Sequence, residues 1–314
     1  MSPFSIRMGV SVAAVCLLSL TSTNCASSPR RAATEQPAPG DTAVIFAPGV
    51  VSTGDVFAST FTPDGRLVIF TKFAPPRPPT LMMSTLIDGQ WTTPTVLPFS
   101  GTYRDLDPAF TPDGTRLYFS SGRPSGPSPA DTTSGVDTWY VVRLNGGWSP
   151  PVRLAEPVSS ADADMFPSLT NRGVLYFDSF RSRPSRRLVY RAALRADGTS
   201  SEPEALPPTI NADSGASNLF VDPDERYVVF GAVRPEGRGG LDLYISWKIP
   251  SGWTTPINLG PTINTEGTEF CPFVARDGRW LYFTRVSTLA DKRVVRNVYV
   301  TRFDPNRYRP PGMR

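Results

Sequence analysis

The amino-acid sequence predicts an all-β fold: a single β-propeller of four-stranded blades, with five blades in the ring and a degenerate sixth blade in the long second copy as the alternative. The first observation is a repeat marked by phenylalanines at positions 70, 119, 177, 230 and 283, with separations of 49, 58, 53 and 53 residues, a period typical of propeller blades. The second is a tight-turn signal before each marker. The third is composition, since 34 prolines and 25 glycines among 314 residues fit many short strands joined by turns.

The best copy of the repeat runs from Gly239 to Arg285. Within it, Asp277-Gly278 precedes the aromatic run Trp280 to Phe283, which is typical of the second strand of a hairpin. Related turns stand before the other markers, at residues 63–65, 112–114, 171–173 and 223–225. Each copy therefore begins with an antiparallel hairpin.

Two more strands complete each copy. A third strand carries one of Met82, Trp139, Tyr190, Tyr244 and Tyr299, and a fourth short strand ends near Leu97, Leu154, Leu206 or Leu259. Tryptophans at positions 91, 148 and 253 begin the run into the fourth strand. Their fixed place in the repeat favours packing between blades over a role in stacking sugars.

The fifth copy lacks a fourth strand, because little chain follows Tyr299. The missing strand is expected at the N-terminus, where residues 45–53 align with residues 258–265. A strand from the start of the chain would then complete the last blade and remove the exposed edges of the ring.

The repeat resembles a known family. Residues 108–119, of the type P-x-F-[ST]-P-D-G-x-x-L-Y-F, and residues 239–265, with G-G-x-D-[IL]-Y and G-W-[ST]-x-P-x-N-L-G, look like the WD40-like PD40 propeller repeats of TolB-type and bacterial envelope proteins. The resemblance covers about residues 42–305. It differs from TolB itself because no separate α/β domain precedes the repeats, and from the histidine- and metal-dependent propeller lyases because the chain contains no histidine.

The N-terminal residues predict export. Arg7 precedes an apolar stretch from Met8 to Leu20, which is short for a membrane span and suits a signal peptide over residues 1–25. Cys25 stands where a bacterial lipoprotein would be cleaved and acylated, with cleavage after Ala26 as the alternative. Residues 26–41 read as a flexible, proline-rich tether, residues 42–305 as the propeller and residues 306–314 as a disordered tail.

Charge and cysteine usage narrow the functional classes. The formal net charge is +4, and arginine and aspartate are interspersed, so no basic stripe of the nucleic-acid-binding kind is present. Once residues 1–25 are removed or Cys25 is lipidated, Cys271 is the one thiol left, and it cannot form a disulfide within the domain. A buried, inert Cys271 is favoured over a nucleophile, because no histidine is available to activate it.

Three acidic residues stand three positions before the proline of the first strand: Asp105, Asp164 and Glu269. The innermost strands of a propeller line its channel, so the three carboxylates are expected to face a common space near one mouth. They could bind a hard cation such as calcium, hydrogen-bond a sugar, or serve as the acid and base of a glycosidase. The PD40 resemblance implies a different role, in which each acidic residue accepts local hydrogen bonds and fixes the loop that enters its strand.

Three arginines, Arg123, Arg181 and Arg234, each follow a phenylalanine marker by four residues. They could receive an anionic ligand on one rim of the propeller. They could equally form ion pairs with Asp137 and Asp242 of the third strands, and this structural role is favoured.

The sequence therefore predicts an exported, non-enzymatic propeller that binds an envelope protein or a peptidoglycan- or glycan-related ligand. It is expected to be a monomer in the periplasm or anchored to the outer membrane through Cys25. The alternatives are a carbohydrate-active hydrolase or lyase that uses Asp105, Asp164 and Glu269, and a propeller with structural calcium. No phosphate-binding glycine loop, zinc-ligand spacing or Ser-His-Asp arrangement is present in the sequence.

Overall fold

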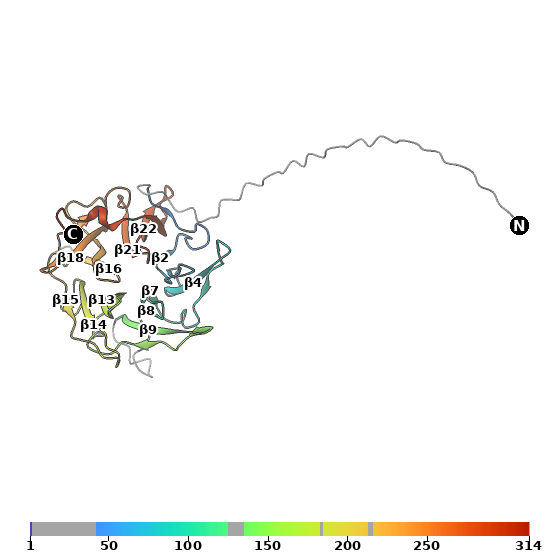
Figure 1. Ribbon diagram of the computed structural model, residues 1–314, viewed down its shortest axis with the longest axis horizontal. Coiled ribbons are helices and arrows are strands. Elements are labelled where there is room, and N and C mark those ends of the chain that lie inside the picture. The colour runs from blue at the N-terminus through green and yellow to red at the C-terminus, as the bar shows by residue number, and fades with distance from the viewer. Residues whose placement is uncertain (2–41, 125–134, 183–184, 213–215, 314) are drawn as a thin grey trace, which may run out of the picture. The chain divides into compact units, whose positions relative to one another are not determined.

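The computed structural model describes residues 1, 42–124, 135–182, 185–212 and 216–313. The predicted signal peptide, the tether and Cys25 lie outside these residues. The described chain from residue 42 onward folds into five antiparallel sheets arranged as the blades of a propeller (Figure 1). The all-β, five-bladed prediction is confirmed.

The first two blades have the same strand order. Blade 1 contains β2 (Val56–Phe61), β3 (Leu67–Lys72), β4 (Thr80–Ile87) and β5 (Gln90–Trp91), with β6 (Thr95–Val96) also paired to β4. Blade 2 contains β7 (Asp105–Phe110), β8 (Arg116–Ser121), β9 (Asp137–Leu144) and β10 (Gly147–Trp148), with β11 (Val152–Arg153) paired to β9.

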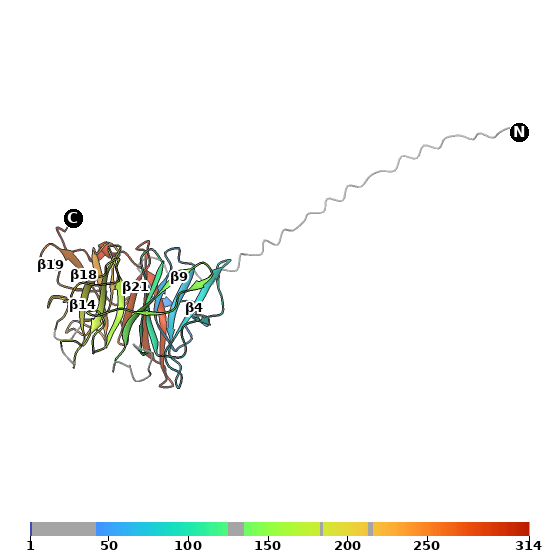
Figure 2. The ribbon, with the colours of Figure 1, turned by 90° about the horizontal axis from the view of Figure 1, so that it is seen from below.

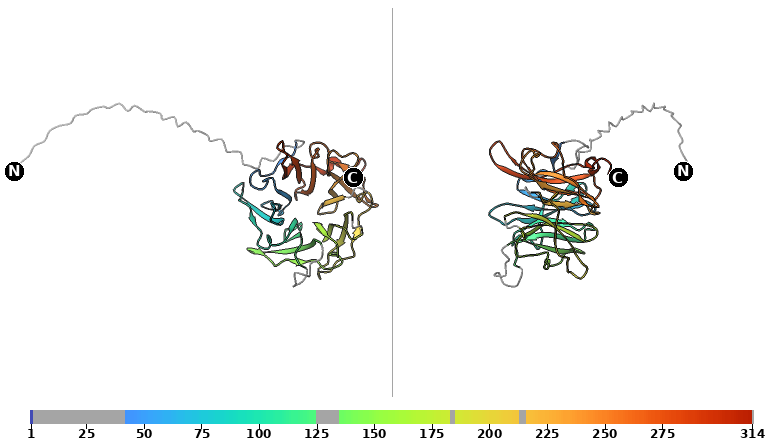
Figure 3. Two further views of the ribbon diagram at one scale, coloured as in Figure 1. Left: turned by 180° about the vertical axis from the view of Figure 1, so that it is seen from behind. Right: turned by 90° about the vertical axis from the view of Figure 1, so that its left-hand side faces the viewer.

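The next two blades repeat this pattern. Blade 3 contains β12 (Asp164–Leu169), β13 (Val174–Ser179), β14 (Leu188–Ala193) and β15 (Glu204–Ala205). Blade 4 contains β16 (Ala216–Val221), β17 (Tyr227–Ala232), β18 (Asp242–Ile249) and β19 (Gly252–Trp253), with β20 (Ile257–Asn258) paired to β18. The views in Figures 2 and 3 show the blades from the side and from behind.

Blade 5 joins the two ends of the propeller. It contains β21 (Thr268–Val274), β22 (Trp280–Thr288), β23 (Val294–Arg302) and the N-terminal strand β1 (Val44–Ile45). Val44 pairs with Val300 and Ile45 with Tyr299, so the blue N-terminal strand lies beside the red C-terminal strands in Figure 1. The prediction that the N-terminal strand closes the ring is confirmed.

The core lies mainly between neighbouring blades. Trp91 of blade 1 packs edge-on against Phe46, which follows β1, at 5.5 Å between ring centroids. Trp148 of blade 2 similarly packs 6.0 Å from Phe99, in the segment after β6. Trp253 of blade 4 lies 6.5 Å from Tyr176 of blade 3. Each tryptophan thus seals a blade against the preceding one, as the repeat predicts.

The C-terminal segment differs from the expected disordered tail. Pro305–Tyr308 forms a short 3₁₀ helix capped by Asp304, and the ordered chain continues to Met313. The Tyr308 hydroxyl donates to the Leu259 carbonyl at 3.0 Å, and the Trp247 Nε1 donates to the Tyr308 carbonyl at 3.0 Å. Because Tyr308 and Met313 pack on the apolar cluster of blades 4 and 5, burial holds a segment that composition alone suggested would be loose.

The propeller has two faces. The hairpin face carries the turns between the first and second strands of each blade, at residues 62–66, 111–115, 170–173, 222–226 and 275–279. The opposite face carries the loops between the second and third strands, because the strands of a blade alternate in direction.

Candidate functional site

The three predicted carboxylates lie near the opposite face, each inside its own blade. Asp105 accepts from the Ser100 and Ser121 hydroxyls at 2.8 and 2.6 Å and from Arg123 Nη2 at 3.1 Å. Asp164 accepts from Ser160 and, at 2.7 Å, from Arg181 Nη2. All three carboxylate residues, Asp105, Asp164 and Glu269, are fully buried.

Glu269 has the same kind of partner, which the sequence pattern missed. Its Oε1 accepts from Arg285 Nε at 2.7 Å, and the two residues face each other across the β21–β22 ladder. Arg285 follows its phenylalanine marker by two residues, whereas Arg123 and Arg181 follow theirs by four. The sequence held a signal for this difference, because position 269 carries a glutamate, whose side chain is longer than that of the aspartates at the equivalent positions.

The arginines also bind the loop that leads into their blade. Arg123 donates to the Phe99 carbonyl at 2.8 Å, Arg181 to the Pro157 carbonyl at 2.8 Å, and Arg285 to the Ile263 carbonyl at 2.7 Å. Arg234 has no carboxylate at the equivalent position, which is Ala216, but it still donates to the Thr209 carbonyl at 3.0 Å. These arginines therefore tie each inner strand to the preceding connection.

The expected pairing with the third strands is not observed. Asp137 pairs with Arg153 at 2.7 Å, and Asp242 accepts from Asn258 Nδ2 at 2.8 Å and from the Arg238 amide at 2.9 Å. Arg123 instead pairs with Asp105 of the first strand. The favoured structural role of the arginines agrees with the geometry, but the partner is different.

The three carboxylates do not meet in the channel, in contrast to the expected ring. Burial raises the pKa of Asp105, while the Arg123 guanidinium and the two serine hydroxyls act in the opposite direction. Burial also lowers the pKa of Arg123. The physical reason for the correction is a β-bulge in each inner strand: the residue that lines the channel lies two positions further along, and the carboxylate lies among the loops.

The bulge residues form the ring that does line the channel. All five have a left-handed backbone, with φ of 47° at Ala58, 56° at Asp107, 55° at Phe166, 56° at Asn218 and 49° at Cys271. A positive φ is uncommon outside glycine, and its recurrence in every blade marks a designed feature of the fold.

Side chains of the preceding blade hold four of these bulges. The amides of Ala58, Asp107 and Phe166 donate to the hydroxyls of Thr284, Thr71 and Ser120 at 3.0, 3.2 and 3.1 Å. The Asn218 amide donates to Asp178 Oδ2 at 3.1 Å. Each acceptor directly follows a phenylalanine marker, and at the fifth such position Gly231 has no side chain to accept a bond.

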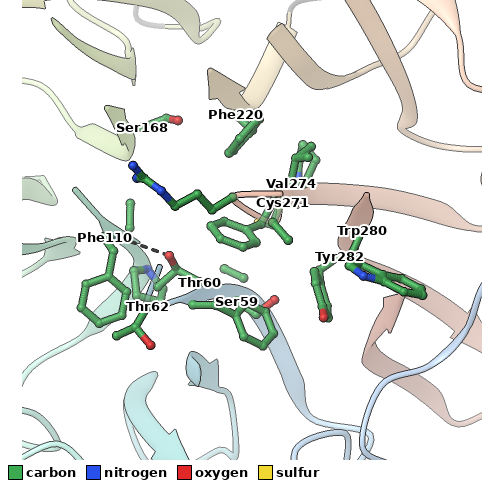
Figure 4. Close-up of a pocket in the computed structure, with 18 of the residues that line it drawn as sticks. Ser59, Thr60, Thr62, Phe110, Ser168, Phe220, Cys271, Val274, Trp280 and Tyr282 are labelled. Atoms are coloured by element: carbon green, nitrogen blue, oxygen red, sulfur yellow. Dashed lines mark hydrogen bonds between the residues drawn. The ribbon is translucent and has the colours of Figure 1, made fainter. Parts of the chain in front are cut away.

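A cavity of about 510 Å³ extends from this ring to the turns of the hairpin face. We call it the channel cavity. Its wall receives residues from all five inner strands, among them Thr60, Phe110, Ser168, Phe220 and Val274, as Figure 4 shows. The wall is mainly apolar, and it includes Phe61 and Trp91 of blade 1 and Trp280 and Tyr282 of blade 5. Its size is that of a small-molecule site.

Ionisable side chains stand at both the mouth and the floor of the channel cavity. At the mouth, Arg276 of blade 5 donates to the Pro112 carbonyl of blade 2, although these blades are not neighbours. At the floor, Asp107 is 4% exposed. Asp178 lies behind the ring, where Arg187 Nη1 is 3.7 Å from its Oδ2.

The electrostatics of the floor disfavour ionised acids. Burial, with added repulsion from Asp178, raises the pKa of Asp107 well above its ordinary value, while the nearby Ser120 hydroxyl, Arg187 and Arg104 act in the opposite direction. Burial raises the pKa of Asp178 to about 7 despite Arg187. Burial and the two carboxyl groups also raise the pKa of the Cys271 thiol. The thiol therefore stays protonated at neutral pH, in agreement with an inert Cys271.

Two general features are absent from the described residues. No group of three or more Cys, Asp or Glu side chains there is arranged to hold a metal ion. In the same part of the chain, no helix is long and apolar enough to cross a membrane.

Comparisons with known proteins find solved structures of similar fold. No protein-family model matches the chain, and no curated protein matches it either. A GH62 α-L-arabinofuranosidase catalytic domain from Coprinopsis cinerea is similar in structure, with a TM-score of 0.53, 12% identity, and coverage of 85% of this chain and 98% of that one. A putative TolB from Agrobacterium tumefaciens has a TM-score of 0.50 and 11% identity over 79% of this chain and 90% of that one. TolB from Acinetobacter baumannii has a TM-score of 0.45 and 15% identity over 80% of this chain, which spans only 56% of that protein.

Proposed function

We propose that this chain is an exported, non-enzymatic β-propeller that binds a protein segment or a small ligand in the bacterial cell envelope. The channel cavity carries this proposal. It combines an apolar wall, polar groups at the floor and an opening among the hairpin turns, which is the usual composition of a ligand site.

The cellular location in this proposal is supported by the signal-like residues 8–20, which lie outside the described residues, and by the structural likeness to a putative TolB. The likeness at 11% identity supports the fold and leaves the partner open. Lipid anchoring through Cys25 belongs to the same proposal. We expect an envelope protein or a glycan-related ligand as the partner, and a monomeric propeller.

The three carboxylates and their arginines take a structural role in this proposal. Asp105, Asp164 and Glu269 are fully buried, and a ligand could not reach them without breaking their ion pairs. Arg234 is the remaining candidate for anion binding, because its position offers no carboxylate partner. Its guanidinium nevertheless stacks 5.4 Å from the Tyr244 ring centroid, which also fits a structural role.

The proposal is tested with a substitution that fills the channel cavity. Ala109 lies on its wall, and Ala109→Phe would occupy the space that a ligand needs. The mature propeller, with and without this substitution, is used as bait for photo-crosslinking in envelope extract, and Asp113→Asn on an exposed hairpin turn is the control. The proposal expects a captured partner that the control retains and Ala109→Phe loses at unchanged melting temperature.

Two results would contradict the proposal. Equal capture by Ala109→Phe and the wild type would show that the channel cavity is not the binding site. Absence of any partner above the level of a bead-only sample would count against a binding role in the envelope.

A carbohydrate-active enzyme is the second candidate, favoured by the structural likeness to an arabinofuranosidase domain at a TM-score of 0.53. Glycosidases need two carboxyl groups on either side of the scissile bond. The predicted trio does not offer such a pair at the channel cavity, since none of its members lines the wall. Release of para-nitrophenol from para-nitrophenyl α-L-arabinofuranoside by the wild type, abolished by Asp107→Asn, would favour this candidate.

Structural calcium remains a third prediction. It is tested by the melting temperature in millimolar calcium and in excess chelator, where a bound structural ion predicts a clear stabilisation by calcium.

A further inference from the structure

The floor of the channel cavity holds polar atoms without partners. Both carboxylate oxygens of Asp107, Nδ2 of Asn218 and Oγ of Ser59 are buried and have no hydrogen-bond partner among the described residues. These residues are only 4–6% exposed, and all three line the channel cavity. They come from the inner strands of blades 2, 4 and 1, so the propeller fold brings them together.

Such a group is unusual in a folded protein. Buried polar side chains are nearly always hydrogen-bonded, and a buried carboxylate without a partner carries a large desolvation cost. The Ser120 hydroxyl, which accepts from the Phe166 amide at 3.1 Å, also acts as a hydrogen-bond donor that lowers the pKa of Asp107. One hydroxyl proton can satisfy at most one of the two oxygens, so acceptor capacity at Asp107 remains.

The unpartnered oxygens of Asp107 favour a cationic hydrogen-bond donor. Asp107 and Asp178 contribute two carboxyl groups, and Arg187, at 3.7 Å from Asp178, can neutralise one of them. Arg104 stands in the exposed segment before β7, and Arg276 is held at the mouth by Pro112. Cys271 adds a protonated thiol. The Asp107 carboxylate is therefore an unused acceptor that faces an apolar space, and a positively charged donor could pair with it.

The apolar wall above the floor favours a cation that carries an apolar or aromatic group. Phe110 and Phe220 line the channel cavity (Figure 4), and Phe166 belongs to the ring itself. The Asn218 amide can offer either a donor or an acceptor beside the carboxylate, and Ser59 can offer a hydroxyl. We propose that the channel cavity binds a small organic monocation, a protonated amine on an apolar or aromatic body, with its ammonium group on Asp107. This inference rests on the proposed ligand-binding role of the channel cavity.

Binding would be linked to a proton. Burial raises the pKa of Asp107 and so favours its protonated form in the empty cavity. An incoming ammonium ion keeps its own protons and stabilises the carboxylate, so the Asp107 proton leaves to solvent. Uptake of one cation thus releases up to one proton, which is a readout that a bound neutral molecule would not give.

The experiment uses three ligands of matched shape and different charge: phenethylamine, 2-phenylethanol and phenylacetate, with tryptamine as a larger amine. Binding to the mature propeller is measured by titration calorimetry at pH 7 in two buffers with different ionisation enthalpies. We expect an amine to bind at least about tenfold more tightly than the alcohol, and the anion to bind weakest. The buffer dependence should report proton release.

The matched variant is Asp107→Asn. Asparagine is the same size and tolerates the left-handed backbone of this position, so the fold should be kept. Loss of the charge should weaken amine binding by at least about tenfold, leave the alcohol nearly unchanged and abolish proton release. Asp107→Ala is the second variant, and Ala58 shows that alanine is accommodated at the equivalent position, with φ of 47°.

The inference fails if no amine binds at millimolar concentration, if the amine binds no better than the alcohol, or if Asp107→Asn leaves amine affinity unchanged. In each of these cases the orphaned atoms are satisfied by water. These outcomes are separate from the failure of the proposed function, which is judged by partner capture with Ala109→Phe.

Discussion

Glu269 and Arg285 face each other across the first hairpin of blade 5, with Arg285 Nε 2.7 Å from Glu269 Oε1. The glutamate is fully buried, and the arginine side chain is 9% exposed. Arg285 also donates to the Ile263 carbonyl, and Glu269 accepts from Thr265. The pair therefore ties the inner hairpin to the connection from blade 4, as Asp105–Arg123 and Asp164–Arg181 do in their blades.

Removing the charge of Glu269 should destabilise the propeller. Glu269→Gln leaves Arg285 buried without its counter-ion, and we expect a loss of about 3–5 kcal/mol in the free energy of unfolding, measured by urea denaturation. Asp291→Asn is the control, because the Asp291–Arg293 pair is exposed to solvent and its loss should leave the stability nearly unchanged. Similar losses in both variants would argue against a structural role for the buried pair.

A substitution at Asp164 tests whether this carboxylate has a structural or a catalytic role. Asp164→Asn removes the charge that faces Arg181 at 2.7 Å, and we expect a loss of roughly 3 kcal/mol in stability. Any glycan cleavage per folded molecule should be unchanged, as measured with para-nitrophenyl α-L-arabinofuranoside alongside thermal unfolding. Loss of cleavage at unchanged stability would instead assign Asp164 a catalytic role.

The closure of the ring depends on Phe46, which follows β1. Its ring packs against Phe61, Trp91 and Tyr282 at centroid distances of 5.2–5.5 Å. We expect Phe46→Ala to cost about 3–5 kcal/mol and to expose the chain before residue 46 to limited proteolysis. Val44→Ala on the exposed side of the same strand should cost less than about 1 kcal/mol. Equal protease resistance in Phe46→Ala would show that the ring does not need this anchor.

The hydroxyl of Thr60 bridges blades 1 and 2. It accepts from the Phe110 amide at 3.2 Å in a buried environment, a bond drawn in Figure 4. Thr60→Val keeps the shape and removes the acceptor, so the stranded amide should cost about 1–3 kcal/mol in thermal unfolding. Thr53→Val, at an exposed site, is the control. A neutral Thr60→Val would mean that the blades do not depend on this bond.

Stability should depend on pH through Asp178. Burial raises its pKa in the folded state to about 7 from an ordinary value of 3.8, so the folded protein holds a proton that the unfolded chain releases between these values. The contribution of this group is thus fully present below pH 3.8 and is lost as the pH rises through 7.

Asp178→Asn removes this titration while its amide oxygen can still accept from the Asn218 amide. We expect the variant to gain stability relative to the wild type as the pH rises from 4 to 8, measured by urea denaturation at each pH. Asp277→Asn, on an exposed turn, should track the wild type across the range. A constant difference between Asp178→Asn and the wild type would contradict the assignment.

The repeat in the sequence was sufficient for the architecture. The spacing of Phe70, Phe119 and the later markers predicted five blades, because each four-stranded unit needs the same run of apolar and turn residues. The alignment of residues 45–53 with the fourth strand of blade 4 predicted closure, since an unpaired β23 would be an exposed edge. The fixed position of the tryptophans in the repeat likewise predicts that they pack between blades.

The candidate site followed from the sequence only in part. Equivalence among Asp105, Asp164 and Glu269 was correct, but the direction of their side chains was not predictable, because it depends on a bulge that carries no residue signature. The five bulge residues, among them Ala58, Asp107 and Cys271, differ in chemistry and share only a positive φ. Their meeting around one cavity is decided by the closure of the ring, which brings strands separated by about fifty residues into contact.

The sequence by itself thus determined the number and order of the strands, because these depend on local periodicity and turn chemistry. Only the tertiary structure decided which polar groups are paired and which are left over. Asp105 meets Arg123 within its own blade, whereas Asp107, two residues later, faces the channel cavity with both carboxylate oxygens unpartnered among the described residues. The difference arises from one extra residue in the inner strand, which the ladder of hydrogen bonds reveals and the one-dimensional pattern does not.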